Sequence, residues 1–351
     1  MRAAAAALML AAIVATPAVS MVRSTERTER LCSLDSTSDE HYRRPYLERG
    51  AARAACRAAR DAAALVAADL VAEAATAFAE AAREAPDDDS RKLVADTAAQ
   101  AFDQRGHDLF NLQDWPASVA SFTLALKYDP HDIKALVGGG NAHVGAAELD
   151  AAIADYGTAL GIDAAAPDVY VLRGNAYEMK LDFDSAIADF SRSIELNPEP
   201  NNALGFRGRL YAAQGRYEDA RRDLERWLIQ NPADIASVVW LHIVHMRLGE
   251  NDSEWLRGQA ATLNLKQWPG PAIAYFLGTE TADQMVQFAQ TSTETMASYQ
   301  KCDGWFYLAE EAVAHGDREK ARALFRRTIE SCNAVDYEWD TAQIELRRLG
   351  P

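Results

Sequence analysis

Four glycines of this chain are separated by a constant spacing of 34 residues: Gly106, Gly140, Gly174 and Gly208. A fixed period of this length is typical of arrays whose repeating unit is a pair of antiparallel helices. Each pair buries its apolar face against its neighbours, so the units stack into a long array with an extended surface. The period therefore predicts an all-α architecture, and it favours the binding of other chains over an active site.

Other residues repeat in register with these glycines. If each glycine is the eighth residue of a unit, the units begin at residues 99, 133, 167 and 201. Glycine lets the two helices of a unit cross closely, and the small residue twelve positions later is expected to face it there. A large residue follows after sixteen positions, and we expect it to fill the space between neighbouring hairpins. This large-residue column is Phe122, Tyr156, Phe190 and Leu224.

One unit carries a recognisable consensus in three segments. Residues 173–177 read Arg-Gly-Asn-Ala-Tyr, residues 186–190 read Ala-Ile-Ala-Asp-Phe, and residues 196–198 read Leu-Asn-Pro. This pattern closely resembles the tetratricopeptide repeat (TPR) consensus, and the resemblance covers about residues 99–250. It implies a right-handed solenoid of antiparallel helical hairpins that is closed by a C-terminal capping helix.

Weaker units flank this array. The helical pattern breaks after Gly249, and Trp268-Pro269-Gly270-Pro271 cannot continue a helix. The expected organisation is a signal peptide (1–20), an N-terminal arm (21–52), a degenerate helical hairpin plus insertion (53–98), the TPR array (99–250), an irregular helical insert (251–301), and a TPR-like hairpin with a capping helix (302–351).

The C-terminal part is also similar to periplasmic TPR adaptors of the new-lipoprotein-I type from Gram-negative bacteria. The similarity rests on Trp268-Pro269, on the segment 275–278, and on Cys302 followed by residues 305–308. Members of that family bind envelope hydrolases and proteases, so the resemblance implies an exported bacterial adaptor. The lipid-attachment motif of the family is absent here.

Residues 1–20 have the features of a secretory signal peptide. Arg2 precedes an apolar run, and small residues end the segment at Ser20, near which we expect cleavage. The predicted location is therefore periplasmic or secreted. The alternative is an uncleaved membrane anchor, although an apolar run of about 17 residues is short for a membrane span.

Four cysteines in an exported chain favour two disulfides. Cys302 is the first residue of its unit and Cys332 the thirty-first, and these positions lie at the same end of an antiparallel hairpin. This predicts the pair Cys302–Cys332 and leaves Cys32 with Cys56, which would tie the N-terminal arm to the first helix. Four free buried thiols in a cytosolic chain are the alternative.

The sequence offers no catalytic constellation. His242 and His245 lie three residues apart and could share a metal, but no third ligand follows at a useful spacing, which favours a structural role. The formal net charge of −16 disfavours nucleic acid and anionic lipid surfaces. We therefore expect no enzymatic activity, no cofactor, no metal and no membrane contact other than an uncleaved anchor.

The residue after each repeat glycine is polar in all four units. In TPR proteins the first helix of each unit faces the inside of the superhelix, so these residues would line a concave groove, with Lys134 nearby. They can donate hydrogen bonds to an extended peptide backbone or a terminal carboxylate. Hydration, or bonding within the array, is an equally open interpretation. We call these residues the ladder: His107, Asn141, Asn175 and Arg209.

The two arginines before the later repeat glycines, Arg173 and Arg207, are expected to bond across their hairpins or to neighbouring acidic residues. Together these features favour a non-enzymatic adaptor of the bacterial cell envelope, which holds an extended segment of a protein or peptide in its groove. The alternative is a platform that associates with itself or with an outer-membrane complex through its convex or C-terminal face.

Overall fold

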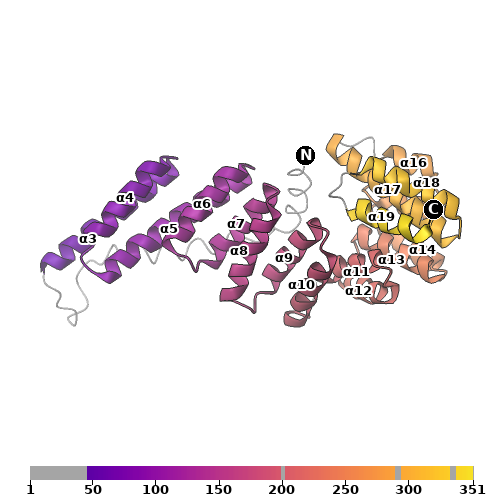
Figure 1. The fold of residues 1–351 in the computed structure, drawn as a ribbon, viewed down its shortest axis with the longest axis horizontal. Helices are drawn as coiled ribbons and strands as arrows, with labels where there is room; N and C mark the ends of the chain where they lie inside the picture. The colour runs from indigo at the N-terminus through magenta and orange to yellow at the C-terminus, as the bar shows by residue number, and fades with distance from the viewer. Residues whose placement is uncertain (1–45, 199–201, 289–293, 333–336, 351) are drawn as a thin grey trace. The chain divides into compact units, whose positions relative to one another are not determined.

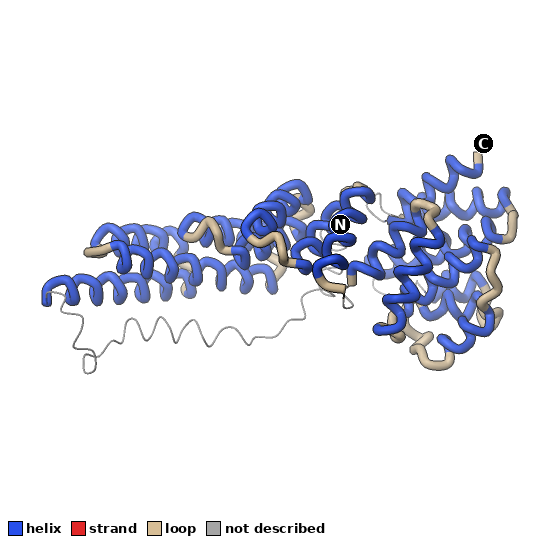
Figure 2. Tube along the Cα trace, turned by 90° about the horizontal axis from the view of Figure 1, so that it is seen from below, coloured by secondary structure: helices blue, strands red, loops and turns tan. Residues whose placement is uncertain are grey.

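The computed structural model describes residues 46–198, 202–288, 294–332 and 337–350 (Figure 1). In these ranges the secondary structure is helical, without a strand (Figure 2), so the all-α fold expected from the period is confirmed. The predicted signal peptide and Cys32 lie outside the described residues. The chain divides into two compact units, at Ala164 and Ala165, which are considered separately below.

The first unit contains three consecutive helical hairpins. Asp87 caps the third helix of this unit, because its carboxylate accepts a hydrogen bond of 2.7 Å from the amide of Ser90. The end of the segment 53–98, where we expected an insertion, is therefore the start of a 24-residue helix. The helices are α3 (Tyr46–Ala67), α4 (Val71–Glu84), α5 (Asp88–Asn111), α6 (Trp115–Tyr128), α7 (Ile133–Gly145) and α8 (Leu149–Ile162).

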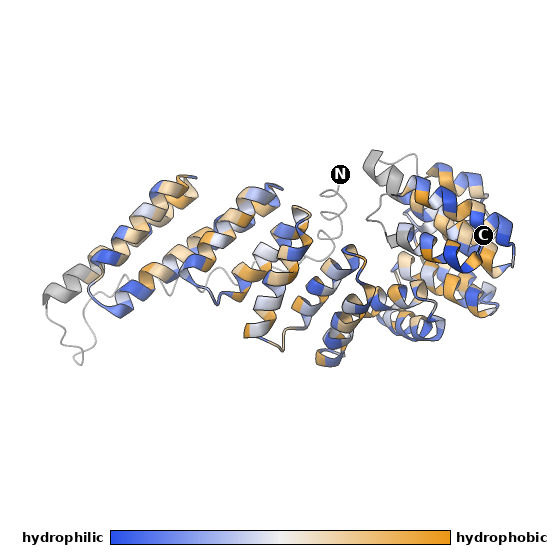
Figure 3. Ribbon diagram, viewed as in Figure 1, coloured by the Kyte–Doolittle hydropathy of each residue, from blue (hydrophilic) through white to orange (hydrophobic). Residues whose placement is uncertain are grey.

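The core of the first unit combines alanines with a cluster of aromatic rings. The rings of Phe78, Phe102 and Tyr128 lie 5.9 to 6.0 Å from one another. The alanines of α3 and α4 let those helices approach closely, and this packing buries Phe78 completely. Apolar and polar residues are interspersed along the helices of this unit (Figure 3).

The repeat glycines lie where the two helices of a hairpin cross. A Cβ atom on Gly106 would come within 2.8 Å of the Phe122 ring, and one on Gly140 within 2.5 Å of the Tyr156 ring. The large-residue column therefore packs onto the glycine of its own hairpin, which corrects the expectation that it fills only the space between hairpins. Phe122 does both, because its ring also lies against Gly138 of the following hairpin.

The second unit begins with regular hairpins and ends with an irregular assembly. Gly249 takes a left-handed conformation with φ of 73° and ends α13, where we expected regularity to stop. The regular helices are α9 (Pro167–Met179), α10 (Phe183–Leu196), α11 (Ala203–Ala213), α12 (Tyr217–Gln230) and α13 (Ile235–Leu248). They are followed by α14 (Ser253–Ala260), α15 (Gly270–Phe276), α16 (Ala282–Phe288), α17 (Glu294–Ala314), α18 (Arg318–Ser331) and α19 (Tyr337–Leu349).

The end of the chain agrees with the sequence pattern in two respects. A closing helix was predicted at α19, and Cys302 and Cys332 form the predicted disulfide, with Cα atoms 4.9 Å apart. Helix α17 begins at Glu294, eight residues before the expected start of the hairpin. Among the described residues, no helix combines the length and the apolar character that a membrane crossing requires.

Candidate functional site: polar residues of the first helices

In the first unit, two of the predicted groove residues lie around one carboxylate. The imidazole of His107 lies one turn beyond Asp103, with 3.7 Å between Nε2 and the nearer carboxylate oxygen. Burial raises the pKa of Asp103, and the positive charges of His107 and Lys134 oppose that shift, whereas Asp132 adds to it. Helices α5 and α7 therefore place an acid between two groups that can be positively charged.

The second ladder residue is bonded inside its own hairpin. The hydroxyl of Tyr156 donates a hydrogen bond of 2.7 Å to the side-chain oxygen of Asn141. Burial raises the pKa of Tyr156, so its hydroxyl stays a donor over the whole physiological range. Bonding within the array, one of the two interpretations left open, therefore holds for the Asn141 oxygen. What Asn141 can offer to another chain is its two amide N–H groups.

In the second unit, the side-chain oxygen of Asn175 is buried and has no hydrogen-bond partner among the described residues. Buried polar atoms are nearly always paired, so this atom is suited to a donor from outside the hairpin. Glu178 is buried one turn later on the same helix. Burial raises the pKa of Glu178, and the positive charge of Arg209 on α11 opposes the shift. The guanidinium of Arg209 lies 5.0 Å above the ring of Phe206.

The ladder is thus divided between the two units, with His107 and Asn141 in the first and Asn175 and Arg209 in the second. One continuous groove along all four stays a prediction. The partners Asp103 and Glu178 were not recognised from the sequence, although each lies one helical turn from a ladder residue.

The two neighbouring histidines of α13 bind a carboxylate. The carboxylate of Asp252 accepts hydrogen bonds of 2.9 Å from Nδ1 of His242 and from Nδ1 of His245. Burial acts to raise the pKa of Asp252, but the two histidines outweigh it and lower the pKa to about 2. The structural role that the spacing favoured is therefore supported. Asp252 lies beyond the end of the helix, where helical periodicity could not reveal it.

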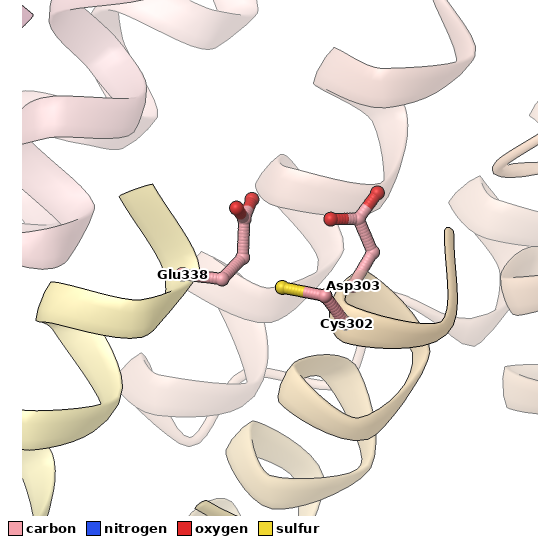
Figure 4. Close-up of side chains that lie close together, drawn as sticks. All are labelled: Cys302, Asp303 and Glu338. Carbon is pink, nitrogen blue, oxygen red and sulfur yellow. The ribbon is translucent and has the colours of Figure 1, made fainter. Parts of the chain in front are cut away.

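Three side chains at the C-terminal end could be taken for a metal site. Sγ of Cys302 and the carboxylates of Asp303 and Glu338 lie within 4.8 Å of one another (Figure 4). However, Cys302 is bonded to Cys332, and metal binding requires a thiolate. Asp303 already accepts a hydrogen bond of 2.8 Å from Nε1 of Trp268. With the disulfide intact, this group therefore offers two carboxylates and no thiolate ligand.

Residues 171–235 match the tetratricopeptide repeat family. No curated protein matches the sequence significantly. Among solved structures, the MamA protein is 19% identical, with a TM-score of 0.44, over 47% of this chain and 91% of that chain. A tetratricopeptide repeat protein from Parabacteroides merdae is 14% identical, with a TM-score of 0.42, over 84% of this chain and 99% of that chain.

A third solved structure, pilF of Pseudomonas aeruginosa, is 16% identical, with a TM-score of 0.43, over 72% of this chain and 99% of that chain. The stronger evidence is internal to the chain. Its repeat glycines recur every 34 residues, each at the crossing of a helical hairpin, and the family match falls within this array. The chain therefore contains tetratricopeptide repeats, as the family match over residues 171–235 and the same period in the flanking hairpins show.

Proposed function

We propose that this protein is a non-enzymatic adaptor of the bacterial cell envelope, which holds an extended segment of a partner protein against its first helices. The observation that carries this proposal is the buried oxygen of Asn175, which has no hydrogen-bond partner among the described residues. An extended chain presents backbone N–H donors and carbonyl acceptors at regular intervals. One N–H would donate to the side-chain oxygen of Asn175, and the guanidinium of Arg209 would donate to a carbonyl or a terminal carboxylate.

The side chain of Arg209 is suited to this role because its position is restrained. Its guanidinium is placed over Phe206, and its charge acts on Glu178, so little side-chain freedom is lost when it binds a ligand. Around Asp103 in the first unit, His107 and Lys134 supply a second polar surface on first helices.

The test is capture of partner proteins from an extract of bacterial cell envelopes by the immobilised protein. In the double variant Asn175→Ala/Arg209→Gln we expect the affinity for a captured partner to fall by roughly 10- to 100-fold, because two polar contacts are lost. Asn111→Ala, an exposed asparagine at the end of α5, is the matched control and should bind as the wild type does. Equal capture by all three folded proteins would exclude this site.

The location in the cell envelope is part of the same proposal and has its own test. It is supported by the signal-like segment before Ser20 and by the disulfide between Cys302 and Cys332, because disulfides persist in oxidising compartments. Sequencing the N-terminus of the mature protein should find a start near Met21, and osmotic shock should release the protein. Retention of Met1 together with free thiols would contradict export.

A further inference from the structure

An arginine precedes the repeat glycine in three of the four units, and glycine takes its place in the unit formed by α7 and α8. These residues are Arg105, Gly139, Arg173 and Arg207. Sixteen positions later, on the second helix of each hairpin, the residues are Ser121, Asp155, Asp189 and Asp223. The unit of α7 and α8 therefore has the aspartate of this pattern without the arginine.

The two complete pairs show what this position does. Nε and Nη2 of Arg173 donate hydrogen bonds of 2.7 and 2.8 Å to the two carboxylate oxygens of Asp189. Arg207 binds Asp223 in the same way, at 2.6 and 2.9 Å, so the prediction that these arginines bond across their hairpins is confirmed. Such two-point contacts match the planar fork of a guanidinium to a carboxylate.

Where the aspartate is replaced, the arginine binds another acid. Arg105 faces Ser121 in its own hairpin, and its Nε donates a hydrogen bond of 3.0 Å to the carboxylate of Asp69, in the turn between α3 and α4. The arginine of this position is therefore paired with a carboxylate in every unit that has one.

Asp155 has no arginine of this kind. A Cβ atom on Gly139 would lie 3.1 Å from a carboxylate oxygen of Asp155, so the carboxylate points to the place where the arginine side chain would begin. The side chain of Asp155 is 27% exposed, compared with 8% for Asp189 and 7% for Asp223, which their arginines cover. The carboxylate of Asp155 is thus more accessible to solvent than the two carboxylates that arginines cover.

The groups that face Asp155 do not replace the arginine. Nε2 of His143 lies 3.7 Å from its carboxylate, and Nδ1 of the same ring lies 2.6 Å from Glu148. Burial raises the pKa of Asp155, and the charge of His143 opposes the shift. A permanent cation at this place would stabilise the carboxylate as the arginines do in the other units.

A second acceptor occurs in the neighbouring hairpin. Nη1 of Arg207 donates a hydrogen bond of 2.9 Å to the hydroxyl of Ser191, which belongs to the preceding hairpin. The residue at the equivalent position before α7 is Thr123 on α6, whose exposed hydroxyl can also accept a hydrogen bond. Asp155 and Thr123 therefore stand at the positions of the two acceptors, Asp223 and Ser191, that bind Arg207.

We propose that Asp155 and the space above Gly139 form a binding site for the guanidinium of an arginine side chain on a partner protein. The arginine would enter from solvent and take the place that Arg173 and Arg207 occupy in their own hairpins. Its two nitrogens would donate to the carboxylate of Asp155. This site lies between α7 and α8 and uses no ladder residue, so it goes beyond the groove proposed above and can fail independently of it.

The test titrates the full-length protein with N-acetyl-L-arginine-N-methylamide, and follows the side-chain carboxyl ¹³C signal of Asp155 by NMR. The signal is assigned by its loss in Asp155→Asn. We expect a saturable shift and a lower titration midpoint of this carboxyl when the arginine compound is bound. The citrulline analogue, which has the same shape without the charge, should bind at least about tenfold more weakly.

Two variants at one position separate binding in this site from binding elsewhere. Gly139→Arg supplies the guanidinium from the chain itself and should abolish the response, whereas Gly139→Ala adds only a methyl group, 3.1 Å from the carboxylate of Asp155, and should weaken the response without abolishing it. If Gly139→Arg does not fold, Asp155→Asn decides, because it should abolish saturable binding measured by calorimetry. Equal binding by Asp155→Asn and wild type, an equal response to citrulline, or no saturable response in the wild type would overturn the proposal.

A further arm of the titration distinguishes the source of the guanidinium. Free L-arginine carries an ammonium and a carboxylate that an arginine within a protein does not present. We expect it to bind no more tightly than the blocked compound. A preference of tenfold or more for the free amino acid would overturn the assignment to a partner protein.

Discussion

The hairpins from α9 to α12 and the segment from α13 to α19 lie in one unit, but different kinds of contact stabilise them. In the hairpins the same contact recurs at a separation of sixteen residues. Gly174 packs against Phe190, and Gly208 packs against Leu224. The arginine and aspartate pairs beside them follow the same spacing. These hairpins are therefore stabilised by the same local contacts, which recur in each unit.

The segment from α13 to α19 relies instead on buried polar contacts between distant residues. Arg247 on α13 donates hydrogen bonds of 3.1 Å to Glu310 on α17 and to Glu345 on α19, which are 63 and 98 residues away. Tyr275 on α15 donates a hydrogen bond of 2.7 Å to Glu311 on α17. None of these contacts repeats. The end of the helical array is therefore held together by ion pairs between distant helices. Each of these charges has to be paired, because burying it alone would be costly.

We call the segment from α13 to α19 the closing segment. Replacing Arg247, which binds both Glu310 and Glu345 there, should have the largest effect on stability. In Arg247→Ala, buried Glu310 loses its hydrogen-bonded cation and buried Glu345 keeps only Arg348, so we expect the free energy of unfolding to fall by about 3–5 kcal/mol. Urea unfolding measures it. The matched control in the regular hairpins is Arg216→Ala, whose ion pair with Asp219 is partly exposed and should contribute less than about 1 kcal/mol. Similar losses in both variants would contradict the contrast between the two regions.

Removing the disulfide between α17 and α18 should weaken the closing segment next. The bond links residues 30 positions apart, and the loop-entropy relation assigns it about 3–4 kcal/mol. We expect Cys302→Ala/Cys332→Ala to lower the free energy of unfolding by that amount. Hydrogen exchange should accelerate in α17 and α18 more than in α9 to α12. Uniform acceleration would show that the two regions unfold together.

The raised pKa of Glu310 should make the stability of the closing segment depend on pH. Burial raises the pKa of Glu310 from 4.5 to about 7, although Arg247 opposes the shift. The folded state thus holds a proton that the unfolded chain releases. Stability from this group is therefore greatest below pH 4.5, falls as the pH rises towards 7, and levels off above it. The change is at most about 3 kcal/mol.

The measurement is urea unfolding between pH 4 and pH 8, in the wild type and in Glu310→Gln. Other groups change protonation over this range, so only the difference between the two proteins reports on Glu310. We expect the variant to lose less stability than the wild type as the pH rises. Parallel curves would show that Glu310 is ionised throughout.

Glycine-to-alanine substitutions in the two regions should change the stability of the protein in opposite directions. A Cβ atom on Gly174 would lie 2.7 Å from the Phe190 ring, so Gly174→Ala should destabilise the hairpin by about 1–3 kcal/mol. Gly258, in α14, has no atom within 4 Å of that position, so Gly258→Ala should stabilise the protein by about 0.5–1 kcal/mol. Thermal unfolding shows both changes. If Gly174→Ala unfolded at a higher temperature than the wild type, the close crossing of α9 and α10 at Gly174 would be contradicted.

The repeat frame could be predicted from the sequence because it depends on local contacts. The glycines, the closing helix over residues 337–349 and the pair Cys302–Cys332 all follow from positions within a 34-residue unit. The contacts of the large-residue column were predicted less well. Phe122 packs both onto the glycine of its own hairpin and onto the next hairpin. Which neighbours a side chain reaches depends on the distances between the packed helices, and the order of the helices along the chain does not specify those distances.

The polar contacts show the limit of the same reasoning. The spacing of His242 and His245 indicated that they share one face of a helix, but their ligand, Asp252, follows a turn whose course no period describes. The ladder residues were identified by position, whereas the bond of Asn141 to Tyr156 and the buried oxygen of Asn175 required the packed helices.

By itself, the sequence determined that this chain is a stack of helical hairpins and where the two helices of each regular hairpin cross, because the residues that define a crossing lie close together along the chain. Only the tertiary structure decided which charges are paired. A carboxylate binds whichever cation the packing places beside it, as Glu310 binds Arg247 across 63 residues. For the same reason, Asp155 beside Gly139 became recognisable as a vacant position only when it was compared with the filled pairs in space.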